Sequence, residues 1–222
     1  GWDARWARYC VDYPRNHGAD PQRLPTLEHF YLTQAPGIVA TQQRAEIFAQ
    51  VLTELVTPDA VAMAVPCGYM DELLRLPGAA AAGALIGVDV EASALAGAQA
   101  NAHEHGLMPQ CVLAQGDAWD LAGAQMVTGD AATYRRAAGG GSDVVVSNGL
   151  NMYVTDDDEV TALYRALRTP LRPGGTLVVS ALTPPATWDL ADVPAEVITR
   201  VRGLMVINPM MWGNYRSVAV TT

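Results

Sequence analysis

The chain has 222 residues, half of them hydrophobic and 17% charged, which is typical of one globular domain and excludes a disordered chain. Its net charge of −9 argues against duplex DNA or RNA as a partner, because phosphate contacts need a basic surface. No apolar run approaches the roughly 18 residues of a membrane span. The three cysteines and four histidines have neither disulfide nor metal-site spacing. We therefore expect a cytoplasmic protein without a metal, a nucleic-acid partner or a membrane contact.

The first 37 residues are rich in aromatic residues, arginine and proline. Aromatic residues recur there at three- and four-residue spacing, as on one face of a helix: Trp2, Trp6, Tyr9 and Tyr13. Several prolines then predict turns. We interpret residues 1–37 as a cap over a pocket and residues 38–222 as the main domain. A helical extension packed on the outside is the alternative, and a homodimer that exchanges the segment is a further hypothesis.

Residues 38–57 have the apolar spacing of a helix. The side chains predicted to face inward are Ile47, Val51, Leu55 and Val56. Pro58 marks the end of this helix.

The next stretch has the pattern of a nucleotide-binding βαβ unit. Residues 61–65 are apolar throughout, as in a strand covered on both faces of a parallel sheet. Residues 66–76 predict a tight glycine turn followed by a helix. A second apolar strand, residues 84–88, ends on Asp89, about 20 residues after the glycine of the turn. An acid in that place is suited to hold a ribose.

Strands and helices continue to alternate through the rest of the chain, which predicts an α/β fold with a doubly wound, mostly parallel sheet. We expect a helix over 91–106, a strand over 111–114, a polar stretch over 122–141, a strand over 143–147, a helix capped by Thr155 and running through Arg168, a strand over 176–182, a helix over 194–205 and a final strand over 215–222.

By this point the chain resembles the class I (Rossmann-fold) S-adenosylmethionine (SAM)-dependent methyltransferase family over about residues 38–182. The motifs that carry the resemblance follow one another in order: AVPCGYMDEL, GVDVE, QGDAW, SDVVVSNGLNMY and LRPGGTLVVS. The resemblance implies a sheet that binds SAM at the carboxyl ends of its strands.

The resemblance also implies a role for each motif. The backbone of Cys67 and Gly68 would pass along the methionine part, and Asp89 would accept hydrogen bonds from the ribose hydroxyls. Asp117 would bind the adenine amino group, with the Ala118 amide beside it. The alternative for both aspartates is a strand-end cap. Asn148 would present an oxygen near the methionyl amine, and Arg44 would pair with the methionyl carboxylate. The complete set of residues expected to bind SAM is Arg44, Pro66, Cys67, Gly68, Tyr69, Asp89, Val90, Asp117, Ala118, Asn148, Gly149 and Leu150.

The sequence departs from the family pattern in three places. Ala64 stands where the first strand usually carries an acid, which removes a common partner of the SAM ammonium group. Pro66 and Met70 replace the usual glycines. Only VAVTT, residues 218–222, is a candidate for the antiparallel hairpin that normally ends the sheet.

No residue is marked clearly as a general base, which methyl transfer needs only when the acceptor arrives protonated. The catalytic candidates, chosen by position, are His29, Tyr31, Asn148 and Tyr153. A structural role is the alternative for His29 and for both tyrosines. Aromatic rings can also hold a sulfonium by cation–π attraction, worth about 0.5–2 kcal/mol each. The rings available for this are those of Tyr9, Tyr31, Tyr69 and Tyr153.

These features predict a methyltransferase that acts on a small molecule, such as a secondary metabolite in a bacterium. The alternative from the same site is cyclisation of SAM itself to azetidine-2-carboxylic acid with release of methylthioadenosine. The loss of an acid at Ala64 would help that reaction, because it needs a neutral amine. A non-catalytic SAM-binding module is the second alternative.

Overall fold

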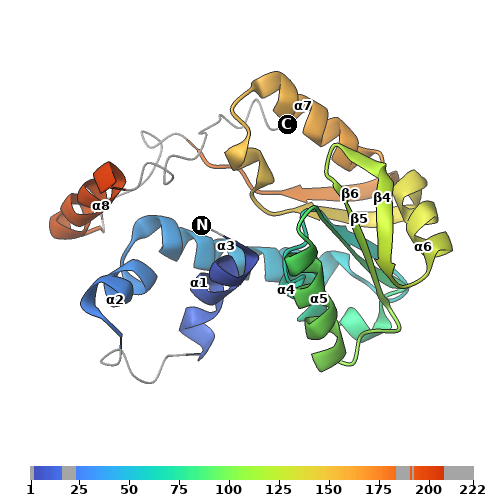
Figure 1. Cartoon of the computed structure of the whole chain (residues 1–222), viewed down its shortest axis with the longest axis horizontal. Coiled ribbons are helices and arrows are strands. Elements are labelled where there is room, and N and C mark those ends of the chain that lie inside the picture. The colour runs from blue at the N-terminus through green and yellow to red at the C-terminus, as the bar shows by residue number, and fades with distance from the viewer. Residues whose placement is uncertain (1–2, 17–23, 184–190, 192, 208–222) are drawn as a thin grey trace. The chain divides into compact units, whose positions relative to one another are not determined.

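The computed structural model of the chain describes residues 3–16, 24–183, 191 and 193–207 (Figure 1). The chain divides into two compact units. One contains residues 1–46 and 181–222, and the other contains residues 47–180. The position of the predicted boundary, residue 37, lies inside helix α3 (Pro36–Leu55), which runs from one unit into the other.

The second unit contains a six-stranded sheet in the order β4-β3-β2-β1-β5-β6. Its strands are β1 (Val61–Ala64), β2 (Ala84–Asp89), β3 (Cys111–Asp117), β4 (Asp120–Thr128), β5 (Ser142–Ser147) and β6 (Leu171–Val179). All neighbouring strands are parallel except β3 and β4. The predicted doubly wound, mostly parallel sheet is confirmed. The carboxyl ends of the parallel strands lie at one edge of the sheet, where this fold binds ligands.

Helices cover both faces of this sheet (Figure 1). The end of α3, α4 (Asp71–Leu74) and α5 (Ala92–Glu104) pack on one face. On the other lie α6 (Ala131–Arg136), η3 (Ala137–Gly141) and α7 (Asp157–Arg168). Alternate residues of the central strands enter the two cores: Ala62 and Ala64 belong to the first, whereas Met63 and Val65 belong to the second. This arrangement explains why the first strand is apolar throughout.

Three local predictions were wrong. Ile47 and Val51 are exposed, and α3 instead buries Phe48 and Leu52, whereas the predicted Leu55 and Val56 do pack on the core. The polar stretch after β3 contains β4, which forms an antiparallel hairpin with β3, and then α6. Helix α7 is capped by Asp156, whose carboxylate accepts hydrogen bonds from the amides of Asp158 and Glu159, and not by Thr155.

The first unit is helical where it is described. It contains α1 (Ala4–Asn16), α2 (Thr26–Thr33), the start of α3 and α8 (Ala195–Ile207). Its small core holds Cys10, Tyr13, Phe30, Leu32, Ala35, Ile38 and Val197. The rings of Trp6, Tyr9 and Tyr13 meet edge to face along α1, which confirms this part of the predicted aromatic face, while Trp2 lies outside the described residues. None of the helices in the described part of the chain has the length and apolar character that a membrane crossing requires. The predicted strand over residues 215–222 lies outside the described residues.

Candidate functional site

The turn after β1 is attached to the end of β2 by backbone hydrogen bonds. The Cys67 amide donates to the Val88 carbonyl at 2.9 Å. The Gly68 amide donates to Oδ2 of Asp89, also at 2.9 Å. Gly68 has a φ of 51°, a left-handed conformation that favours glycine. The glycine of the first motif and the acid of the second motif therefore meet.

Asp89 is a buried acceptor, with 6% of its surface exposed. Its Oδ1 accepts a second hydrogen bond, from the Glu91 amide at 3.0 Å. Burial raises the pKa of Asp89, and the hydrogen bonds from the Glu91 and Gly68 amides oppose that shift. Each carboxylate oxygen has more than one lone pair. The two backbone contacts thus orient the carboxylate and leave it able to accept the hydroxyl donors of a ribose.

The buried side-chain amide of Asn101, on α5, forms hydrogen bonds with the segment that follows this turn. Asn101 is 1% exposed, and its Nδ2 donates to the Tyr69 carbonyl at 2.9 Å and to Oδ1 of Asp71 at 3.0 Å. Asp71 also pairs with Arg75 at 2.8 Å. Sequence reasoning missed Asn101. Its place on the buried stripe of an alanine-rich helix, beside Ala98 and Ala102, was the available signal, because a buried amide needs partners.

The side chains of the turn serve packing. A Cβ added at Gly87 would lie 2.9 Å from the Cys67 sulfur and 3.0 Å from the Met70 sulfur, so these sulfurs fill the space above that glycine. A Cβ added at Gly97 would lie 2.3 Å from the Tyr69 ring, which places the ring against α5. Burial, and then the charges of neighbouring carboxylates, raise the pKa of Cys67 well above its usual range. The Cys67 thiol therefore stays protonated.

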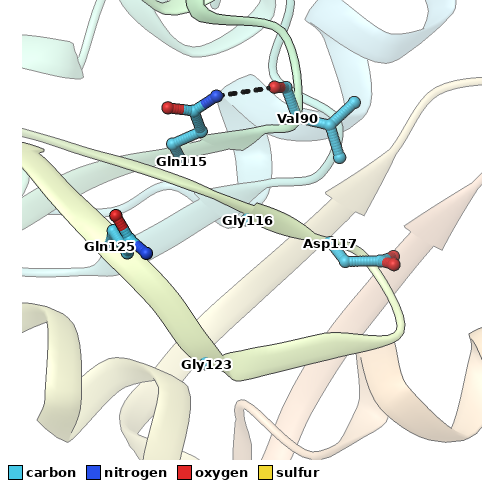
Figure 2. Close-up of a pocket in the computed structure, with 6 residues that line it drawn as sticks. All are labelled: Val90, Gln115, Gly116, Asp117, Gly123 and Gln125. Atoms are coloured by element: carbon cyan, nitrogen blue, oxygen red, sulfur yellow. Dashed lines mark hydrogen bonds between the residues drawn. The ribbon is translucent and has the colours of Figure 1, made fainter.

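The β3–β4 hairpin forms a second part of the site, with a cavity of about 420 Å³ (Figure 2). The cavity is lined by Val90, Gln115, Gly116, Asp117, Gly123 and Gln125. Gln115 Nε2 donates to the Val90 carbonyl at 2.9 Å, which joins the ends of β3 and β2. The Val90 side chain is 57% exposed, and the Asp117 carboxylate is also exposed.

The tip of this hairpin is fixed at the surface. Oδ1 of Asp117 accepts a hydrogen bond from the Trp119 amide at 3.0 Å. The Trp119 indole donates to the Glu159 carbonyl of α7 at 3.1 Å. Ala118, which lies between Asp117 and Trp119 in the chain, is buried. The Asp117 carboxylate keeps acceptor capacity for an amino group such as that of adenine.

The end of β5 contributes a third group of predicted residues. Asn148 Nδ2 donates to Oε2 of Glu72 at 3.4 Å, and Ser180 Oγ donates to Asn148 Oδ1 at 3.2 Å. Gly149, with a φ of 98°, precedes the short helix η4 (Leu150–Tyr153). Tyr153 is 67% exposed.

The structure therefore brings most of the predicted residues to one edge of the sheet. The segments 66–69, 89–90, 117–118 and 148–150 follow the carboxyl ends of β1, β2, β3 and β5. His29, Tyr31 and Arg44 belong to the other compact unit, so their roles stay predictions.

Comparison with solved structures finds a strong likeness over the whole chain. The chain is 33% identical, with a TM-score of 0.80, to a structure described as a possible exported protein from Bordetella parapertussis, over 100% of this chain and 70% of that one. A scan against protein-family models and a search of curated proteins each found no match.

More distant likenesses concern the fold alone. A geranyl diphosphate methyltransferase in complex with SAM is 15% identical, with a TM-score of 0.51, over 91% of this chain and 69% of that one. The same enzyme in complex with GPP and sinefungin is 15% identical, with a TM-score of 0.50, over 82% and 58% of the two chains. These likenesses confirm the predicted class I methyltransferase fold.

Proposed function

This chain belongs to the same family as the Bordetella parapertussis protein and has the class I methyltransferase fold, and from that premise we propose that it binds SAM and transfers the methyl group to a small molecule. The observation that carries the proposal is the contact between Gly68 and Asp89, which sets a buried, oriented carboxylate beside a glycine turn. The SAM complex of the geranyl diphosphate methyltransferase supports the choice of ligand.

The residues of the second unit fit the parts of SAM. Asp89 would accept the ribose hydroxyls, and the exposed Asp117 would accept the adenine amino group, with Val90 as an apolar surface beside it. Bound SAM supplies an electrophilic methyl group on a sulfonium, which the acceptor attacks in line. The protein would position the two molecules and exclude water, and both effects contribute to the rate of a displacement of this kind.

The proposed class of methyl acceptor rests on the composition of the sequence. The net charge of −9 favours a small molecule over a nucleic acid. We propose that the protein works without a metal, in the cytoplasm, as a monomer or a homodimer. Asn148 and Tyr153 are the catalytic candidates that lie in the same unit as the glycine turn. We keep His29 and Tyr31 as candidates from the other unit.

The test is mass spectrometry of the purified protein incubated with SAM, first alone and then with a panel of small-molecule acceptors. Acceptor-dependent S-adenosylhomocysteine supports the proposal. Methylthioadenosine with a C4 amino acid, formed from SAM alone, would instead identify the cyclisation. Tight SAM binding without any product would identify a binding module. Asp89→Ala is the control that should abolish either reaction, because it removes the ribose acceptor.

A further inference from the structure

A polar cluster at the edge of the sheet joins three separate elements. Glu72 comes from α4, Asn148 follows β5, and Ser180 follows β6. Ser180 donates to Oδ1 of Asn148 at 3.2 Å, which fixes the orientation of the amide, and the amide nitrogen then donates to Oε2 of Glu72 at 3.4 Å. The result is a half-buried carboxylate held toward the end of β5.

Glu72 also faces the glycine turn. The charges of Asp89 and Glu72 both act on the Cys67 thiol, and both raise its pKa. Both carboxylates therefore lie near the turn that would carry the ligand, Asp89 through its bond with the Gly68 amide and Glu72 through its place on α4, which follows the turn. The neighbouring Asp71 is already paired with Arg75 and bonded to Asn101.

The end of the first strand supplies no charge of its own. Ala64 and Val65 are apolar and fully buried in the two cores. A carboxylate that balances a cationic group beside the turn would therefore come from another element. SAM carries such a group in its α-ammonium, which has three N–H donors like those of lysine.

We infer that Glu72 is the carboxylate that binds the α-ammonium of SAM, with Asn148 Oδ1 as a second acceptor; this rests on the proposed function. Glu72 on α4 and Asn148 at the end of β5 contact each other, so the ammonium would lie beside that contact. Asn148 acts as a positioning residue for Glu72 as well as an acceptor.

The test compares two ligands on two variants by isothermal titration calorimetry. S-adenosylhomocysteine carries the α-ammonium, whereas methylthioadenosine lacks the whole amino acid and keeps the adenosine. Glu72→Gln removes the charge and keeps the size and an acceptor for Asn148. Glu104→Gln is the matched control, because Glu104 is exposed at the far end of α5.

We expect Glu72→Gln to weaken S-adenosylhomocysteine binding by about 10- to 100-fold, as for the loss of a charged hydrogen bond, and to change methylthioadenosine binding by less than about twofold. Glu104→Gln should change neither, and Glu72→Asp should recover part of the loss. Equal weakening of both ligands would overturn the inference, because it would show that Glu72 only holds the turn in shape. Unchanged binding of both would overturn it too. Failure of the wild-type protein to bind S-adenosylhomocysteine would refute the proposed function itself.

Discussion

The turn after β1 is held by buried hydrogen bonds, whereas the tip of the β3–β4 hairpin is held at the surface. Asn101 and Asp89, which fix the turn, are 1% and 6% exposed. Asp117, which fixes the hairpin tip, is exposed. A buried donor or acceptor that loses its partner costs far more than an exposed one, which water can satisfy. Substitutions at the turn should therefore reduce stability and binding together, while substitutions at the hairpin should reduce binding alone.

The strongest test of this comparison is Asn101→Ala. It removes the donor to the Tyr69 carbonyl and to the Asp71 carboxylate, inside the protein. We expect the free energy of unfolding to fall by about 2–4 kcal/mol, measured by urea denaturation. Gln99→Ala, at an exposed position of the same helix, should change it by less than about 0.5 kcal/mol. A small loss for Asn101→Ala would contradict the view that the turn depends on this amide.

A second test uses the contact between Gly97 and Tyr69. Gly97→Ala places a methyl group where the ring lies, 2.3 Å from its nearest atom. We expect a loss of about 1–2 kcal/mol, because overpacking outweighs the helix propensity of alanine. In a Tyr69→Ala background the same change should stabilise the protein by roughly 0.5–1 kcal/mol. A double-mutant cycle from thermal and urea unfolding measures the difference, and additive effects would show that the ring and the glycine are not in contact.

At the hairpin, Asp117→Ala should leave the free energy of unfolding within about 0.5 kcal/mol of the wild type, because the carboxylate is exposed. Binding of S-adenosylhomocysteine should weaken by about 5- to 20-fold through the loss of the proposed hydrogen bond to adenine. Calorimetry measures the binding, and Asp120→Ala, on the same exposed hairpin, is the control. A loss of stability as large as that of Asn101→Ala would remove the distinction between the two regions.

The smallest expected effect is a pH dependence at the turn. Burial raises the pKa of Asp89 in the folded protein above its usual value of 3.8. Between the two pKa values the folded state binds more protons than the unfolded state, so the stability contributed by Asp89 is complete below pH 3.8 and is lost as the pH rises through the folded-state pKa. The wild type should therefore lose stability relative to Asp89→Asn over that window, measured by urea denaturation at a series of pH values. A difference that stays constant with pH would contradict the raised pKa.

The sequence predicted the sheet well where the signal is local. The runs before Asp89 and Asn148 are apolar because those strands are covered on both faces, and a polar residue follows where each strand leaves the core. The sequence did not predict strand β4, because it is the outermost strand of the sheet. Its side chains are only partly buried, and Gly123 and the alanines beside it weaken the alternating pattern. A strand that buries few side chains lacks the pattern of apolar residues by which a strand is predicted from sequence.

The sequence by itself determined the α/β class, the place of the glycine turn and the acids that end β2 and β3, because each depends on the order of apolar and polar residues along a few neighbouring positions. Only the tertiary structure decided that Asn101 holds the turn and that Asn148 and Ser180 hold Glu72. These contacts join residues that are 30 or more positions apart. Hydrogen-bond partners at such separations depend on how helices pack on the sheet, and no local pattern of residue types records that packing.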